Sequence, residues 1–406
     1  MVRKISNKIR AISYRWQMGR FEKNINQSTL RNHVAISEWS VGCMKTAAIN
    51  LTADMQSESG DPIVLQGRRL NKETRSAFKN KLSKTEGVRI LIHLPPAQIS
   101  PGGFSLFNNL IQSLEFIGIE VKALEWDGNI SDALAQFKPS VFITSDHPVY
   151  LGRIDWPALQ KHKRANKLMV GLTASLEQYG NSPLKERLDR AEKNGIDFFY
   201  SFRDKDYLTN RKEYRPFHDR GFSILTVEFG ANPLFYYPVP DLARDLDYVF
   251  LASANQDKWR RYFSYLKTIF TENYGYIDGP GWGFSSGVGI LPHRDRYLYA
   301  RAKVGLNLHL QEQIDWPCEL NERTYQLAAC GVPQLLDDPA LLNNKFSREC
   351  FFSTGSPGEY RELFDYILEH PDQARERALA AQREVYARHT TFHRAEQFVL
   401  QLKEMF

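Results

Sequence analysis

The sequence predicts an α/β protein with two doubly wound parallel sheets in tandem, preceded by a basic N-terminal extension. Two observations lead to this fold class. From residue 88 onward, short apolar runs of strand length alternate with segments of helical spacing, and glycines stand in the loops between them. The alternation starts again after the proline-bearing stretch 233–240. The length of 406 residues also fits roughly two to three domains of ordinary size.

The first series of strands and helices is assigned to residues 87–235. It opens with an apolar strand, followed by a loop that contains Gly102 and Gly103. Glycines at that point either let the backbone approach a ligand or serve a plain turn. The predicted strands are 88–94, 119–124, 140–144, 167–172, 197–201 and 223–227, and the predicted helices are 104–116 and 132–137.

The second series is assigned to residues 236–375. Its predicted strands are 246–251, 275–277, 304–310 and 332–336, and its predicted helices are 258–272 and 323–330. Residues 376–406 are expected to form helices that pack back across the domains. Ligands of doubly wound sheets bind at the carboxyl ends of the strands, so we expect a site in a cleft where the two sheets face each other.

The composition is that of a folded protein from a reducing compartment. Hydrophobic residues make up 42% of the chain and charged residues 25%, which excludes disorder over its whole length. No apolar run approaches the roughly 18 residues that cross a bilayer, and the N-terminus lacks the apolar core of a signal peptide. The four cysteines form no CxxC pair, which disfavours a zinc site. We therefore expect a cytoplasmic enzyme.

Positive charge is concentrated in residues 1–31. This segment holds eight cations and one acid, a net charge of +7, and since the whole chain carries +6 the remainder is near −1. Its apolar residues at 5, 9, 12 and 16 share one side of a helix. One interpretation is a basic amphipathic helix on an anionic membrane, at the inner face of the plasma membrane. The other is a helix docked on the protein's own body. A nucleic-acid partner is disfavoured, because the basic residues are terminal and the sequence shows no recognised nucleic-acid-reading motif.

The whole extension comprises residues 1–86, and no fold follows from its pattern. Within it, residues 61–65 are predicted to form a short strand and residues 72–84 a charged helix.

The most informative segment is 321–333, which reads NERTYQLAACGVP. It resembles the helix "N-x-R-x-(F/Y)-E-x-x-A-C-G" of the metal-independent nucleotide-sugar glycosyltransferases of the GT-B fold (glycosyltransferase group 1), and most of all their spore-maturation-protein (CgeB-type) branch. Segments 229–238, 247–253, 279–282, 303–309 and 389–394 resemble further motifs in the family's order. The resemblance covers 229–400 well, 88–228 loosely and 1–87 not at all. It implies two Rossmann-like domains and a nucleotide-sugar donor.

The resemblance also implies a donor-binding site in the second series. A helix that starts near Asn321 and Arg323 would present backbone N–H groups and a guanidinium to the donor diphosphate. Lys258 stands where the family carries a phosphate-binding cation, and Arg261 belongs to the same basic loop. Gly281 belongs to a turn that resembles the family's "G-x-G-W".

Two carboxylate positions depart from the family pattern. Gln326 stands where the family usually has a Glu that accepts hydrogen bonds from both ribose hydroxyls, and it lacks that charge. Glu319 is assigned to the sugar contact, one position from the family register. The acidic pair Asp204 and Asp206 is the weaker, metal-binding alternative. We expect no metal and no cofactor beside the nucleotide-diphosphate sugar.

The acceptor hydroxyl must lose a proton, and the predicted base follows the strand at 140–144. Asp146 and His147 stand at its carboxyl end, and both residue types serve as general bases. The alternative is a helix-capping Asp beside a loop His. His93, at the end of the first strand, is a weaker candidate.

The function we expect is transfer of a sugar from the nucleotide donor to a cell-surface polysaccharide or glycolipid. The alternative is a catalytically impaired GT-B-like binding or assembly protein, for which Gln326 is the main support. Another two-domain enzyme, such as a sugar epimerase, has no distinguishing motif in the sequence.

Overall fold

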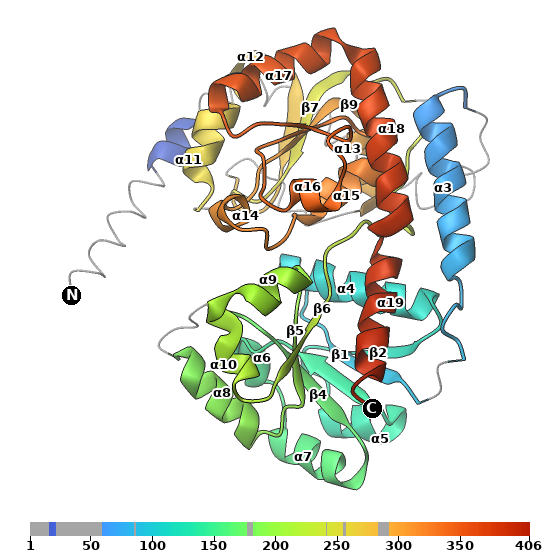
Figure 1. Ribbon diagram of the computed structural model, residues 1–406, viewed down its shortest axis with the longest axis vertical. Coiled ribbons are helices and arrows are strands. Elements are labelled where there is room, and N and C mark those ends of the chain that lie inside the picture. Colours follow the sequence, from blue (N-terminus) through green and yellow to red (C-terminus); the bar gives the residue numbers. More distant parts are fainter. Residues whose placement is uncertain are drawn as a thin grey trace. The chain divides into compact units, whose positions relative to one another are not determined.

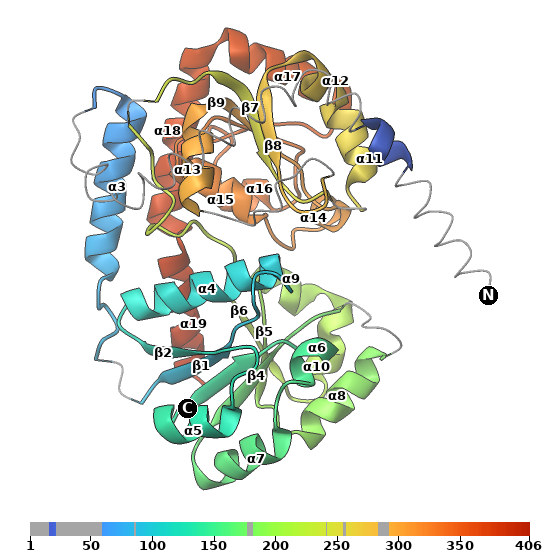
Figure 2. The same cartoon turned by 180° about the vertical axis from the view of Figure 1, so that it is seen from behind.

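The computed structural model describes residues 16–21, 59–84, 87–176, 182–240, 242–254, 257–282 and 292–406. The chain divides into two compact units. Unit 1 comprises Met1–Glu73 and Pro233–Arg388, and unit 2 comprises Thr74–Asn232 and His389–Phe406. Each unit holds one parallel sheet with helices on its faces (Figures 1 and 2), which confirms the predicted α/β class.

Unit 2 contains a six-stranded parallel sheet in the order β2-β1-β3-β4-β5-β6. The strands are β1 (Arg89–His93), β2 (Glu120–Leu124), β3 (Val141–Thr144), β4 (Met169–Thr173), β5 (Phe198–Ser201) and β6 (Ser223–Thr226). All four residues of β3 and of β5 are buried, as continuous apolar runs in a sheet covered on both faces require. β2 lies at the edge, and its first four residues alternate between exposed and half-buried.

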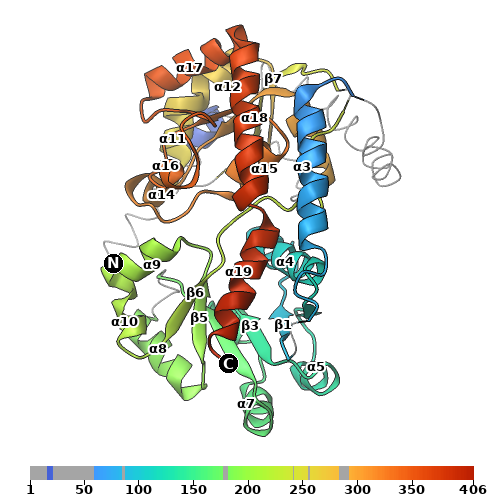
Figure 3. The ribbon, with the colours of Figure 1, turned by 45° about the vertical axis from the view of Figure 1, so that its right-hand side comes forward.

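The helices of unit 2 cover both faces of this sheet. They are α4 (Pro101–Phe116), α5 (Ile130–Phe137), α6 (Pro148–Leu151), α7 (Trp156–Ala165), α8 (Leu184–Lys193), α9 (Lys205–Asn210), the 3₁₀ turn η1 (Lys212–Tyr214), α10 (Arg215–His218) and α19 (Thr391–Lys403). α4 and α19 lie on one face, and α5 and α7 lie on the other (Figures 1 and 3). Phe116 stacks on Phe392 at 4.3 Å between ring centroids, which joins the C-terminal helix to α4.

Unit 1 contains a five-stranded parallel sheet in the order β11-β10-β9-β7-β8. The strands are β7 (Leu246–Leu251), β8 (Gly275–Asp278), β9 (Ala302–Asn307), β10 (Gln334–Leu336) and β11 (Phe352–Ser353). The helices are α3 (Pro62–Phe78, which runs on into unit 2), α11 (Trp259–Arg261), the π-helix η2 (Tyr262–Leu266), α12 (Lys267–Glu272), α13 (Pro292–Arg301), α14 (Gln311–Asp315), α15 (Glu322–Ala329), α16 (Leu342–Lys345), α17 (Pro357–Glu369) and α18 (Pro371–Arg388). α17 packs on η2, β9 and β10, and α15 packs on α18. α3 lies along α18 (Figure 3), and Gln66 donates to the Leu379 carbonyl at 2.9 Å.

Three predicted elements differ from the structure. Residues 61–65 are not a strand, because Asp61 and Pro62 start α3: the Asp61 side chain accepts from the Ile63 N–H at 2.9 Å, and proline suits the first helical position. The charged helix predicted at 72–84 is the second half of α3 and ends at Phe78. The segment 258–272 is helical but widens to a π-helix over five residues in its middle.

No helix among the described residues is long and apolar enough to span a bilayer. The predicted amphipathic helix within residues 1–31 lies outside the described residues, apart from 16–21.

Candidate functional site

The carboxyl ends of β7, β9 and β10 meet at one edge of the unit 1 sheet, which we call the carboxyl edge. β9 is hydrogen-bonded to both other strands and all three are parallel, so the loops that follow them lie side by side. α15 also begins at this edge. Its N-cap, Asn321, donates through Nδ2 to Asn307 Oδ1 at 2.8 Å and accepts from the Thr324 N–H at 3.2 Å. The Asn321 side chain therefore holds against β9 the helix start whose backbone N–H groups are predicted to meet a diphosphate.

Asp337 ties the loop after β10 to the loop after β9. It is fully buried, and its carboxylate lies 2.7 Å from His309 Nδ1 and accepts the His309 N–H at 2.8 Å. Because an ionised carboxylate only accepts, Nδ1 of the ring carries the proton. Burial alone would raise the pKa of Asp337, but His309 and Arg261 hold it at about 2. Burial lowers the pKa of His309 against the attraction of Asp337, which leaves a neutral ring beside a charged carboxylate.

Arg323 is anchored on two strands. Its Nε donates to the Leu251 carbonyl at 2.7 Å, one Nη donates to Asn307 Oδ1 at 3.0 Å, and the guanidinium lies over the Phe250 ring. Burial lowers the pKa of Arg323, although a guanidinium stays charged at neutral pH. A guanidinium carries five N–H donors, and within the described residues these contacts use only two of them. The remaining donors can serve an anion.

Lys258 and Arg261 complete a group of three cations at the carboxyl edge. Lys258 Nζ donates to the Leu308 carbonyl at 3.0 Å, and Arg261 donates to Asp337 Oδ2 at 2.6 Å. The pKa of Lys258 is lowered to about 7, first by burial and then by repulsion from Arg323 and Arg261, while Asp337 and Glu319 oppose the shift. Three cations that repel one another at a strand end are an arrangement that a bound diphosphate would stabilise.

The two departures from the family pattern have local partners. Gln326 lies on the buried side of α15, 7% exposed, and its Oε1 accepts from the Tyr299 hydroxyl at 3.4 Å. Glu319 accepts from Gln313 Nε2 at 3.0 Å, which links it to α14. Glu319 is close enough to the three cations to raise the pKa of Lys258.

Gly281 lies in the loop after β8, beside the loop after β7. Its φ of +88° is a backbone conformation that favours glycine, and a Cβ there would lie 3.0 Å from the Ala254 carbonyl oxygen. The Ala254 N–H donates to the Pro280 carbonyl at 2.8 Å, and Trp282 Nε1 donates to the Ala252 carbonyl at 2.7 Å. The glycine turn thus fixes one loop against the other.

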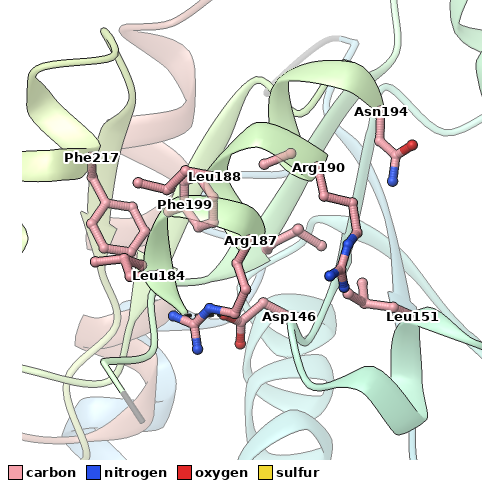
Figure 4. A pocket seen from close by; sticks show the side chains of 11 residues that line it. Asp146, Leu151, Leu184, Arg187, Leu188, Arg190, Asn194, Phe199 and Phe217 are labelled. Atoms are coloured by element: carbon pink, nitrogen blue, oxygen red, sulfur yellow. Dashed lines mark ion pairs between the residues drawn. The ribbon is translucent and has the colours of Figure 1, made fainter. Parts of the chain in front are cut away.

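In unit 2, Asp146 lies in the loop after β3, at the wall of a pocket that α8 covers (Figure 4). It is buried, accepts from the Thr173 hydroxyl at 2.9 Å and forms an ion pair with Arg187 at 3.5 Å. Arg187, from α8, also donates to the Ser175 carbonyl. These contacts hold the carboxylate as part of the packing of α8 on the sheet. The role of Asp146 as a base stays a prediction.

His147 is the N-cap of α6. It is half-buried, and its Nδ1 accepts from the Val149 N–H at 3.2 Å. In a neutral ring with Nδ1 as acceptor the proton sits on Nε2, so His147 would have to release the cap before it could accept a proton through Nδ1. The role of His147 as a base also stays a prediction.

The glycines predicted to lie in a loop form the first turn of α4, which begins at Pro101 rather than at residue 104. A Cβ on Gly102 would meet no atom within 4 Å, whereas one on Gly103 would lie 2.6 Å from Ser100 Oγ and 2.8 Å from Tyr150 Oη. Gly103 therefore permits close packing of Tyr150. His93 is also a packing residue: it stacks on Trp126, and burial lowers its pKa to about 4.

Asp204, one of the two acidic residues considered as a metal site, instead caps a helix. Asp204 is the N-cap of α9, and its Oδ1 accepts from the Asp206 and Tyr207 N–H groups at 2.9 and 3.1 Å. In the part of the chain that the structure describes, no group of three or more His, Cys, Asp or Glu side chains is placed to hold a metal ion.

Two residues that organise the carboxyl edge, Asp337 and His309, were not predicted as site residues. In the structure both stand just beyond a strand end, a signal that the sequence offered for Asp337 but not for His309, which falls inside the predicted strand 304–310. His309 closes the segment 303–309 that carries a family motif, and Asp337 directly follows the predicted strand 332–336.

Comparison with known proteins adds a family match over part of the chain. Residues 265–399 match the model of a family described as glycosyl transferase-like. This range begins in η2, includes all of α15 and ends in α19. No curated protein matches the sequence.

Solved glycosyltransferase structures share the fold. Sucrose-phosphate synthase from Thermosynechococcus elongatus aligns over 78% of this chain and 99% of its own, with a TM-score of 0.52 and 14% identity. A glycosyltransferase from Rickettsia africae aligns over 79% and 99%, with a TM-score of 0.53 and 11% identity. T4 phage BGT in complex with its UDP-glucose substrate aligns over 78% and 99%, with a TM-score of 0.52 and 12% identity.

At these identities the likeness shows the fold, and the two Rossmann-like units match the GT-B glycosyltransferase structures. The match to the glycosyl transferase-like family, together with this fold, supports a glycosyltransferase. The CgeB-type branch stays a prediction.

Proposed function

We propose that the protein is a GT-B glycosyltransferase that binds the diphosphate of a nucleotide sugar at the carboxyl edge of unit 1, through Lys258, Arg261 and Arg323. The observation that carries this proposal is the convergence of these three cations on the ends of parallel strands. Cations and a helix start stabilise the charge that develops on a leaving diphosphate, so the reaction we propose needs no metal.

The proposed roles follow from the anchoring contacts. Arg323 is held by Leu251 and Asn307 and would direct its remaining N–H donors at a phosphate oxygen. Lys258 would supply a point charge that gains a counter-ion when the donor binds. Asn321, Asp337 and His309 would act as positioning residues, because they hold α15 and the two loops in register.

The acceptor we propose is a cell-surface polysaccharide or a glycolipid. The basic segment 1–31 supports it, because its charge suits work at an anionic surface. Transfer in a cleft between the two sheets, and a base at Asp146 or His147, belong to the same proposal.

A second candidate function is donor binding without transfer, as in a catalytically impaired binding or assembly protein. Gln326 favours it, because the uncharged amide binds ribose hydroxyls more weakly than a carboxylate and here already accepts from Tyr299.

Calorimetric titration with UDP-glucose and GDP-mannose tests the donor site. We expect Lys258→Met and Arg323→Met to weaken binding by roughly 10- to 100-fold, the value of a charge-assisted hydrogen bond. Lys303→Met is the matched control, since Lys303 lies near the amino end of β9 and pairs with Asp247. Absence of binding to either nucleotide sugar, or equal affinities of the Lys258 and Lys303 variants, would overturn the proposal.

A further inference from the structure

A second cationic surface lies on unit 1, where the helix of residues 16–21 packs beside α11 (Figures 1 and 2). Met18 and Phe21 of this helix are buried in the hydrophobic core of unit 1. The Phe21 ring lies 6.1 Å from Phe263 and 6.3 Å from Trp282 between centroids. Burial of two such side chains contributes about 1.5–3 kcal/mol each, so this end of the extension is part of the folded unit.

Aromatic rings on this surface are exposed. Trp16 is 61% exposed and Phe263 is 46% exposed, while Trp259 is half-buried. Trp259, Phe263 and Lys267 follow one another at four-residue spacing along α11, η2 and α12. Tyr262 and Leu266 of the same segment are buried, so the exposed side chains share the outward side.

A cation lies over each of these rings. The distance from cation to ring centroid is 4.6 Å for Arg20 over Trp16, 4.8 Å for Lys267 over Phe263 and 5.8 Å for Arg260 over Trp259. None of these three cations forms an ion pair with a residue that the structure describes. By contrast, Arg361 of α17 and Arg375 and Arg388 of α18 each pair with a carboxylate. The six side chains Trp16, Arg20, Trp259, Arg260, Phe263 and Lys267 are called the aromatic–cation surface below.

We propose that the aromatic–cation surface docks on an anionic membrane. Large aromatic rings settle at the headgroup level of a bilayer, and Arg and Lys reach the phosphates while their stems stay on apolar surface. Trp16 and Phe263 are exposed among the described residues, and the cations beside them form no ion pair with a described residue, which fits that environment. The preceding residues 1–15, which the structure does not describe, add five cations and no acid.

The proposal is independent of donor chemistry. The donor cation Arg261 points to Asp337 at the carboxyl edge, whereas its neighbour Arg260 lies over Trp259. Loss of the membrane contact should therefore leave UDP-glucose affinity unchanged, and failure of donor binding would leave the docking test intact.

Co-flotation of the full chain with vesicles tests the surface. The vesicles are phosphatidylcholine alone or phosphatidylcholine with about 30% phosphatidylglycerol. We expect binding to the anionic vesicles only, and release when salt rises from about 0.1 M to about 0.5 M. Each Lys or Arg near such a surface contributes about fivefold in affinity, so the triple variant R20Q, R260Q, K267Q should bind at least tenfold more weakly.

The matched control removes three exposed cations from other parts of unit 1. This control variant carries R69Q and K72Q in α3 and R348Q in the segment before β11. It loses the same three positive charges as the first triple variant. Binding within twofold of the original chain is expected for this control. Equal binding by the two triple variants, or equal binding to both kinds of vesicle, would overturn the proposal.

A second readout covers the aromatic side chains and does not depend on charge. Brominated lipids in the anionic vesicles should quench part of the tryptophan fluorescence, and Trp16→Phe should remove that part. Trp316→Phe is the control, because Trp316 is 47% exposed on the same unit. Thermal unfolding verifies that each variant folds.

Duplex DNA is the competing polyanion, since one structural neighbour is an α-glucosyltransferase in complex with UDP-glucose and DNA. If the triple variant loses affinity for duplex DNA and keeps its affinity for anionic vesicles, the surface serves a nucleic acid and the membrane proposal is wrong.

Discussion

Donor binding is predicted to take up a proton at Lys258. In the donor-free protein the pKa of this ammonium is about 7, because burial and the neighbouring Arg323 and Arg261 disfavour the charged form. A diphosphate beside Lys258 would favour the charged form and return the pKa toward the ordinary value near 10.4. Raising the pH is therefore the perturbation that separates a phosphate-binding lysine from a solvated one.

The sign and size of the effect follow from linkage. Below about pH 7 the lysine is charged in both states, so affinity is independent of its titration. Above it, each pH unit costs about 1.36 kcal/mol of binding free energy until the pKa of the bound state is reached. Because the free lysine is already half deprotonated at pH 7, the affinity should fall about 50-fold between pH 7 and pH 9, or about 2.3 kcal/mol.

Titration calorimetry with UDP-glucose measures this linkage, because the diester diphosphate of that ligand does not titrate in the range. At pH 8, two buffers with different ionisation enthalpies should report an uptake of about 0.9 proton for each ligand bound. Lys258→Arg is the control, since a guanidinium stays charged throughout and should give a flat profile with no uptake. An affinity that rises with pH, or the same proton uptake in both proteins, would refute the reasoning.

Three further predictions concern stability and the nucleotide contact. Asp337→Asn should lower the free energy of unfolding in urea by about 3 kcal/mol, because Arg261 loses a buried carboxylate partner; an unchanged midpoint would contradict this. Gly103→Ala should lower the melting temperature and Gly102→Ala should not, since only the first Cβ meets atoms within 4 Å. Gln326→Glu should tighten UDP-glucose binding about fivefold, because hydrogen bonds to a charged acceptor are about 1 kcal/mol stronger; weaker calorimetric affinity would place the ribose elsewhere.

The central strands could be predicted from the sequence because they are short apolar runs that both faces of a sheet bury. β3 and β5 are such runs, with every residue buried. The start of α3 could not be predicted from apolarity, because residues 61–65 have the composition of a strand. The capping Asp61 and the proline after it carried the contrary signal. The π-helix at 262–266 has no distinct period that the hydrophobic pattern of the sequence reveals.

The site residues could be predicted only where a single sequence motif contains the residue and indicates what it does. Arg323 and Asn321 lie in such a motif at a helix start. Asp337 and His309 are 28 positions apart and meet because β9 and β10 are neighbours in the sheet. Strand order is a tertiary property, so a carboxylate at the end of one strand does not reveal which strand supplies its partner.

Enzyme and binding protein differ in what they require beyond the cations. Binding needs only Lys258, Arg261 and Arg323 near a diphosphate, and proton uptake at Lys258 would be the same in both cases. Transfer also needs a group that accepts the acceptor's proton. Asp146 is held by Arg187 and Thr173, and His147 caps α6 through the nitrogen that would accept. Transfer through His147 Nδ1 thus requires that its contact with the Val149 N–H be released first. Proton-linked donor binding together with UDP release on a glycan acceptor would establish the enzyme, whereas the same binding without UDP release on any acceptor would favour the impaired protein.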